Sequence, residues 1–154
     1  MSSIESNVFL TFSLSSQLYG IEFTRVKEIL TFKGATAVPD SKPWVKGVID
    51  LRDCATPLID LRIRFGLEKE PIYDEKTVII AVKIGNGKFI AYVVDAVDTI
   101  ETTRFNEIMP PNSSGVIDPE FLKGYFKTDS GKMTIILDVE KILAAEEMNK
   151  LVQL

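Results

Sequence analysis

Residues 45–66 read VKGVIDLRDCATPLIDLRIRFG, and this stretch decides the fold expected for the chain. It holds two apolar runs, at 48–51 and 58–61, in which charged residues occupy alternating positions. Successive side chains of a strand point to opposite faces, so this pattern predicts two half-buried strands. The charged segment 62–64 and the glycine at position 66 predict one or two helical turns that end at that glycine.

The composition is that of a globular protein. The chain has 154 residues, of which 45% are hydrophobic and 26% charged, which suits one ordinary domain and argues against disorder. Its apolar runs fall far below the ~20 residues that span a bilayer, and its first residues, MSSIESNV, lack the regions of a secretory signal. We therefore expect a cytoplasmic protein without direct membrane insertion. The formal net charge of -4 argues against a nucleic-acid partner, which needs a basic face.

The reactive side chains argue against an enzyme. Without any histidine, the usual base of Ser and Cys triads and the commonest transition-metal ligand are missing, so we expect no metal, cofactor or catalytic residue. The single cysteine, Cys54, cannot form an internal disulfide and is expected to be a small packed or loop residue. A carboxylate-based enzyme is the catalytic alternative. Its candidate pairs, Asp95 with Asp98 and Glu22 with Glu28, alternate with other charges as a solvated face does.

Further strands are predicted on both sides of residues 45–66. After an expected tail at 1–7, residues 9–23 alternate as a hairpin, and 24–30 fit either a short helix capped by Thr24 or another strand. In the second half, strands are predicted at 77–84, 88–95, 96–103 and 132–138. A helical period then runs over 139–154.

The two halves of the chain resemble each other. The corresponding positions are Val26 and Ile29 with Val97 and Ile100, Lys46-Gly47 with Lys123-Gly124, and Asp60 with Asp138. Their spacing drifts slowly along the chain, as a duplicated unit with small loop insertions would give. A unit of ~60 residues is only marginally stable alone, so two mainly β units packed through a shared apolar interface are expected. The alternative is that any two runs of short strands look alike.

Several motifs in register resemble the bacterial chemotaxis coupling proteins of the CheW-like domain family. They are FLTFSL, YGIEF, VKEI, VPDSKPWVKGVIDLR, PLIDLRIRFGL and ILDVEKIL, in the order of the family. The resemblance covers residues 8–143 as a single domain. It implies a mainly β fold of two packed, five-stranded, SH3-like β-barrels at roughly 8–70 and 77–138, with exchange of strands between them allowed, short helices, and a C-terminal helix at 139–154.

The same resemblance implies a non-catalytic adaptor in chemotaxis signal transduction. Such a protein couples chemoreceptors, the methyl-accepting chemotaxis proteins, to the histidine kinase CheA. The expected partners are the cytoplasmic hairpin tip of a receptor and the regulatory domain of CheA. The protein is expected to be a monomer when isolated and to be recruited to membrane-associated receptor arrays.

Receptor-binding residues can be assigned where this sequence matches the family motifs. The resemblance assigns a receptor-facing role in the first half to Val26, Glu28, Ile29, Gly47 and Arg52. Val97 and Ile100, the counterparts of Val26 and Ile29, are expected across the same groove. Apolar side chains would hold one face of the receptor helix, while Arg52 would fix its orientation.

The sequence departs from the family pattern beside Arg52. Where the family commonly has Asn-Leu-Arg-Gly, this chain has Asp50-Leu51-Arg52-Asp53. A positive φ is harder to reach for Asp53 than for a glycine, and Asp50 and Asp53 are expected to pair with Arg52 and hold it away from a partner. A specialised scaffold of a non-flagellar chemosensory array is therefore the alternative function.

Overall fold

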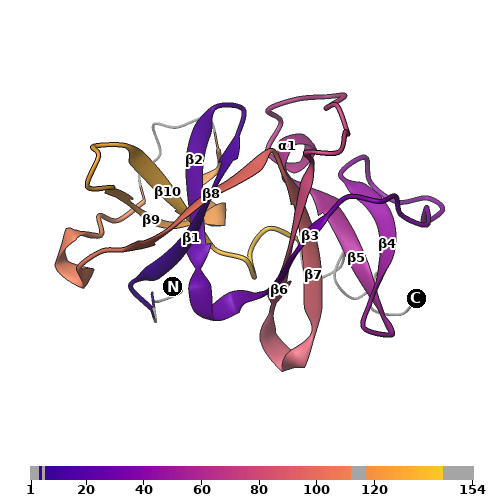
Figure 1. Cartoon of the computed structure of the whole chain (residues 1–154), viewed down its shortest axis with the longest axis horizontal. Helices are drawn as coiled ribbons and strands as arrows, with labels where there is room; N and C mark the ends of the chain where they lie inside the picture. Colours follow the sequence, from indigo (N-terminus) through magenta and orange to yellow (C-terminus); the bar gives the residue numbers. More distant parts are fainter. Residues whose placement is uncertain (1–3, 5, 112–116, 144–154) are drawn as a thin grey trace.

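Two five-stranded sheets lie side by side in the chain (Figure 1). The structure is a computed structural model that describes residues 4, 6–111 and 117–143. The first sheet contains, in spatial order, β8 (Ala96–Thr102), β1 (Val8–Leu14), β2 (Gln17–Glu22), β10 (Met133–Leu137) and β9 (Leu122–Lys127). The second contains β3 (Val26–Thr31), β6 (Val78–Lys83), β7 (Phe89–Val94), β5 (Cys54–Asp60) and β4 (Val45–Leu51).

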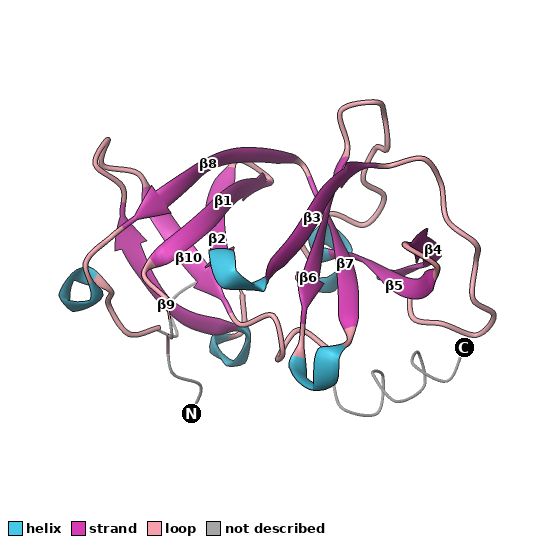
Figure 2. Ribbon diagram, turned by 60° about the horizontal axis from the view of Figure 1, so that its bottom comes forward, coloured by secondary structure: helices cyan, strands magenta, loops and turns pink. Residues whose placement is uncertain are grey.

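Helical structure is confined to short segments among the described residues. They are α1 (Leu61–Arg64) and the 3₁₀ turns η1 (Phe23–Arg25), η2 (Gly85–Gly87), η3 (Phe105–Glu107) and η4 (Pro119–Phe121) (Figure 2). The predicted helical turn after residue 61 is thus α1, and Gly66 follows it with a φ of 71°. No described helix is long and apolar enough to cross a membrane.

Both sheets contain strands from both halves of the sequence. The parallel pair β2 and β10 joins the halves in the first sheet, and the parallel pair β5 and β7 joins them in the second. The two sheets therefore do not coincide with the predicted ranges 8–70 and 77–138. The exchange of strands that the resemblance allowed is what the pairing shows.

Equivalent backbone contacts occur in the two halves. The amide of Asp60 donates to the carbonyl of Trp44, and the amide of Asp138 donates to the carbonyl of Phe121, both over 2.8 Å. A single bridge also links the two edges of each sheet: Thr36 with Val48, and Met109 with Tyr125. Full closure of the sheets into barrels stays a prediction, supported by these two bridges.

The largest apolar cluster lies between the sheets. It takes buried side chains from both, such as Phe12 and Tyr19 from the first and Ile80 and Tyr92 from the second. Smaller clusters line the other face of each sheet, around Phe126 and Leu58, respectively. Strands such as β6 and β7 are therefore buried on both faces, which explains their nearly continuous apolar sequences.

The structure decides between the two alternatives for residues 24–30 and corrects the predicted start of one helix. Residues 26–31 form β3, the strand alternative, because a six-residue helix gains few hydrogen bonds, whereas β3 pairs with β6 along its length. The helix predicted at 139–154 does not begin at 139, since residues 139–143 form turns and bends; residues 144–154 lie outside the described part. In the expected tail, the Asn7 side chain donates to the carbonyl of Thr103 over 2.8 Å.

Candidate protein-binding site

β3 presents one apolar side chain to solvent. Ile29 is 47% exposed, whereas Val26 is half-buried and packs against the cluster between the sheets. A bulge between residues 26 and 28 interrupts the pairing with β6, and Glu28 is half-buried beside it. Of the two apolar residues predicted here, Ile29 is thus available to a partner, and Val26 contributes mainly to the core.

Gly47 is required by close packing of the backbone. Its φ is +133°, and a Cβ atom at this position would overlap the carbonyl of Thr36. Gly124 in the second half meets the carbonyl of Met109 in the same way. The structure therefore explains Gly47 through the bridge between the sheet edges, without any partner.

Arg52 lies in the two-residue turn between β4 and β5. Arg52 and Asp53 have φ values of 52° and 68°, so the turn reaches the left-handed region even though Asp53 stands at the family's glycine position. The amide of Asp53 donates to Oδ1 of Asp50 over 2.9 Å, which satisfies the turn locally. The predicted pairing of these aspartates with Arg52 is wrong, because Asp50 is engaged by the backbone of its own turn.

The ion-pair partner of Arg52 is Glu28. The Nε atom of Arg52 lies 3.5 Å from Oε2 of Glu28, and the Arg52 side chain remains 69% exposed. Glu28 Oε2 is buried but accepts no hydrogen bond within the described part of the chain. A pair with one largely exposed member contributes less than about 1 kcal/mol, so the Arg52 guanidinium remains available to a charged or polar partner.

β8 carries the second pair of predicted residues. Val97 is half-buried against the cluster between the sheets, and Ile100 is 56% exposed. A register shift in β1 accompanies this strand, and the buried hydroxyl of Thr11 donates to the carbonyl of Thr99 over 2.9 Å. β3 and β8 are edge strands of different sheets, and both send one valine to the same cluster. The common groove between them stays a prediction.

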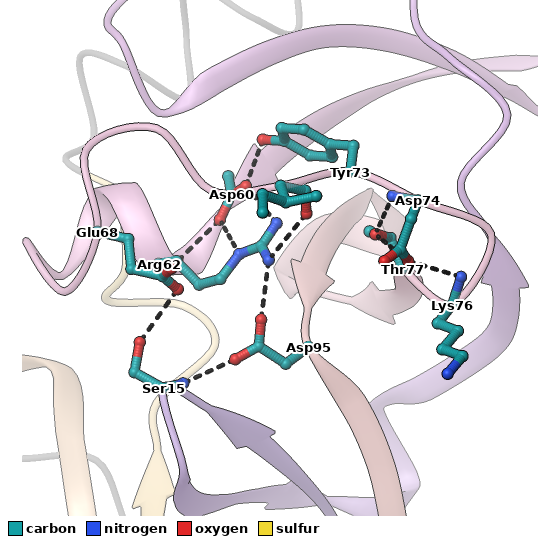
Figure 3. Close-up of polar contacts among 10 residues, drawn as sticks. Ser15, Asp60, Arg62, Glu68, Tyr73, Asp74, Lys76, Thr77 and Asp95 are labelled. Atoms are coloured by element: carbon teal, nitrogen blue, oxygen red, sulfur yellow. Dashed lines mark hydrogen bonds and ion pairs between the residues drawn. The ribbon is translucent and has the colours of Figure 1, made fainter.

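A buried ion-pair network lies at the end of β5 (Figure 3). The guanidinium of Arg62 donates to both carboxylate oxygens of Asp60, over 3.1 and 3.0 Å, and to Oδ1 of Asp95 over 2.8 Å. Asp60 also accepts from the backbone amide of Arg62 and from the hydroxyl of Tyr73, so both of its oxygens are used twice. The side chains of Asp60 and Arg62 are 0% and 5% exposed.

The charges of this network reinforce one another. Burial by itself lowers the pKa of Arg62, but the hydrogen bonds and the charges of Asp60 and Asp95 raise it by more. The net pKa lies above its ordinary value, so the guanidinium stays charged. Burial, and then the hydrogen bond to Asp60, raises the pKa of the Tyr73 hydroxyl above its ordinary value. Sequence reasoning missed this network. The available signal was the difference between the two halves of the chain. Arg62 follows Asp60-Leu61 in the first half, whereas Glu140 follows the corresponding Asp138-Val139 in the second, so the duplicated fold does not require the arginine.

Three of the four candidate catalytic carboxylates, Glu22, Glu28 and Asp95, have structural partners, and Asp98 is exposed on β8. Glu22 pairs with Lys123 over 2.6 Å, and both side chains are less than a tenth exposed. Asp95 belongs to the Arg62 network. In the described part of the chain, no group of three potential ligands could hold a metal ion. Cys54 is exposed at the start of β5, and therefore neither packed nor in a loop.

Comparisons with known proteins identify the family of the chain. The model of the CheW-like domain matches residues 8–147. The chemotaxis protein CheW of Klebsiella aerogenes is 34% identical over 91% of this chain and 83% of the relative, and CheW of Bacillus subtilis is 28% identical over 89% and 86%. The crystal structure of the scaffolding protein TtCheW from Thermoanaerobacter tengcongensis superposes with a TM-score of 0.83 at 32% identity, covering 92% of this chain and 95% of that one. The chain therefore belongs to the CheW-like domain family.

Proposed function

We propose that this chain works as a chemotaxis adaptor through two separate protein-binding surfaces, one for receptors and one for the kinase. As a member of the CheW-like family it is a non-catalytic protein that couples chemoreceptors to CheA in chemotaxis signal transduction. The finer proposal concerns the parts that meet. The partners are the cytoplasmic hairpin tip of a receptor and the regulatory domain of CheA.

One observation supports the proposed receptor surface: β8, an edge strand of the first sheet, and β3, an edge strand of the second, each expose an isoleucine. Ile29 on β3 is 47% exposed and Ile100 on β8 is 56% exposed, while the valines beside them anchor both strands to the common cluster. A receptor hairpin presents helical faces with apolar residues at regular intervals, and such a face buries exposed side chains of this size. Each isoleucine is already about half buried, so completing its burial would contribute about 0.8–1.5 kcal/mol.

The polar part of the proposed receptor surface is the Glu28 and Arg52 pair. The Arg52 guanidinium is largely exposed and has five donors, so it can bind a carboxylate or carbonyl of the receptor while remaining near Glu28. Asp50 accepts the amide of Asp53, and Arg52 pairs with Glu28 instead of with either aspartate. The departure from the family motif therefore offers no support for the specialised-scaffold alternative.

The kinase domain is proposed to bind elsewhere on the chain, because an adaptor must hold both partners at once. Recruitment to membrane-associated receptor arrays then follows from receptor binding. We propose that the isolated protein is a cytoplasmic monomer.

Direct titration against a receptor hairpin tests the receptor surface. Ile29→Asp is expected to weaken binding at least about tenfold, because it places an unpaired charge against an apolar helix face. Ile72→Asp is the matched control, since Ile72 is 77% exposed and lies on the connection between α1 and β6. Equal affinities of the two variants would reject this receptor surface, and absence of binding by the unsubstituted chain would reject receptor coupling.

A further inference from the structure

A chain of polar contacts crosses from one sheet to the other. Arg62 lies in α1, directly after β5 of the second sheet, and its Nη1 donates to Oδ1 of Asp95 over 2.8 Å. The other oxygen of Asp95 accepts the backbone amide of Ser15 over 2.7 Å. Ser15 belongs to the turn between β1 and β2 of the first sheet. One carboxylate thus receives a donor from each sheet, as Figure 3 shows.

This contact has a directional geometry that the apolar interface lacks. Apolar burial between the sheets is non-directional and tolerates small rotations. The guanidinium of Arg62, by contrast, is fixed by two parallel hydrogen bonds to Asp60, with nearly complete burial of both side chains. A rotation of one sheet against the other would break the contact between Arg62 and Asp95.

Both strands of the proposed receptor surface are attached to this network. Asp95 directly precedes β8, and its amide donates to the carbonyl of Ser13 in β1 over 3.0 Å, so its position sets where β8 begins. On the other side, the ring of Tyr73, which donates to Asp60, packs 5.0 Å from the ring of Phe32, the residue after β3. The network therefore connects the start of β8 with the end of β3.

We propose that Arg62 and Asp95 are positioning residues that fix the mutual orientation of the two sheets, and thereby the separation of β3 and β8. The role in binding rests on the proposed function, whereas the orienting role does not. Arg62 and Asp95 need not touch the receptor. They act by holding Ile29 and Ile100 at the spacing that one helical hairpin can contact.

Asp95→Asn is the variant that separates this role from simple stability. Because one of the two acceptor oxygens becomes an NH₂ donor, either Arg62 or Ser15 loses its acceptor. Glu22→Gln is the matched control: it weakens another buried ion pair, but Glu22 on β2 and Lys123 on β9 belong to the same sheet. Asp95→Glu retains both acceptors and serves as the rescue variant.

The orientation can be measured by pulsed electron resonance between two spin labels on the full-length chain. Cys54 is an exposed native site on the second sheet, and Lys127→Cys places a label on an exposed position of β9 in the first. Asp95→Asn should broaden or shift the distance distribution, Asp95→Glu should restore it, and Glu22→Gln should leave it unchanged. An unchanged distribution in Asp95→Asn, or an equal change in Glu22→Gln, would overturn the proposal.

Receptor-hairpin titrations of the unlabelled variants complete the test. Asp95→Asn is expected to weaken binding about threefold to tenfold, the range typical of substitutions that act through a coupled network. Glu22→Gln should bind as the unsubstituted chain does. Equal affinity for Asp95→Asn and the unsubstituted chain would remove the role in binding. If the unsubstituted chain binds no hairpin, the proposed function fails, while the distance measurement still decides the orienting role.

Discussion

Replacement of Gly47 by alanine is expected to open the bridge between the edges of the second sheet. A Cβ atom at this position would overlap the carbonyl oxygen and carbon of Thr36, and these backbone atoms cannot rotate away as a side chain could. The bridge consists of two hydrogen bonds between Thr36 and Val48, of 2.9 and 2.8 Å, which must lengthen to make room. The residue would also remain at a φ of +133°, which alanine rarely adopts.

The expected loss of unfolding free energy is about 3 to 5 kcal/mol. Backbone strain contributes about 1 to 3 kcal/mol, and the two lost hydrogen bonds about 1 kcal/mol each. Gly66→Ala provides the matched control, because Gly66 has a φ of +71° but no atom within 4 Å of a Cβ. That control should lose only the cost of the left-handed conformation, about 1 to 2 kcal/mol.

Urea unfolding followed by tryptophan fluorescence measures both variants. Trp44, the single tryptophan, lies beside the Arg64 guanidinium, 4.6 Å from its carbon, and so reports on the folded state. The midpoint should fall further for Gly47→Ala than for Gly66→Ala. If both variants unfold at the same urea concentration, close approach of the Thr36 carbonyl does not explain Gly47.

Three further outcomes are expected. Burial, and then the charge of Asp138, raises the pKa of Tyr92 above its ordinary value of 10.0. Because the unfolded chain loses this proton first, the free energy of unfolding should fall as the pH rises above about 10. Titration of Tyr92 near pH 10.0 in the folded protein, measured by absorbance at 295 nm, would refute this. Asp60→Asn should cost up to about 3–5 kcal/mol in urea unfolding, clearly more than Asp138→Asn, because it removes the fully buried carboxylate that pairs with Arg62 and leaves Asp95 as the remaining ionic partner. Equal losses would contradict the assigned role of the ion pair. Arg64→Lys should lower the melting temperature in calorimetry because a lysine cannot stack on Trp44 as the planar guanidinium does, and an unchanged temperature would show that the stacking is not stabilising.

Local sequence patterns predicted most of the strands but not their pairing. The alternation in residues 45–66 is enough to identify β4, β5 and α1, since each pattern reflects which side chains meet the core. Periodicity does not say which strands lie side by side. The parallel contacts of β2 with β10 and β5 with β7 depend on residues far apart in the chain, so local patterns are compatible with sheets assembled from both halves but do not predict them.

The candidate site shows the same limit. Asp50 and Asp53 are the nearest opposite charges to Arg52 in sequence, and local reasoning therefore paired them with it. The structure engages Asp50 with the backbone of the turn and brings Glu28 to Arg52 from another strand. Likewise, the family motif treats Val26 and Ile29 alike, whereas the alternation of β3 turns Val26 toward the core and leaves Ile29 about half exposed.

The most direct test of the adaptor proposal is a sedimentation measurement of the unsubstituted chain and Ile29→Asp with a receptor hairpin and the CheA regulatory domain together. The unsubstituted chain should form a ternary complex, and Ile29→Asp should retain the kinase domain while losing the hairpin. Competition between the two partners for the unsubstituted chain, or loss of both by Ile29→Asp without unfolding, would contradict two separate binding surfaces.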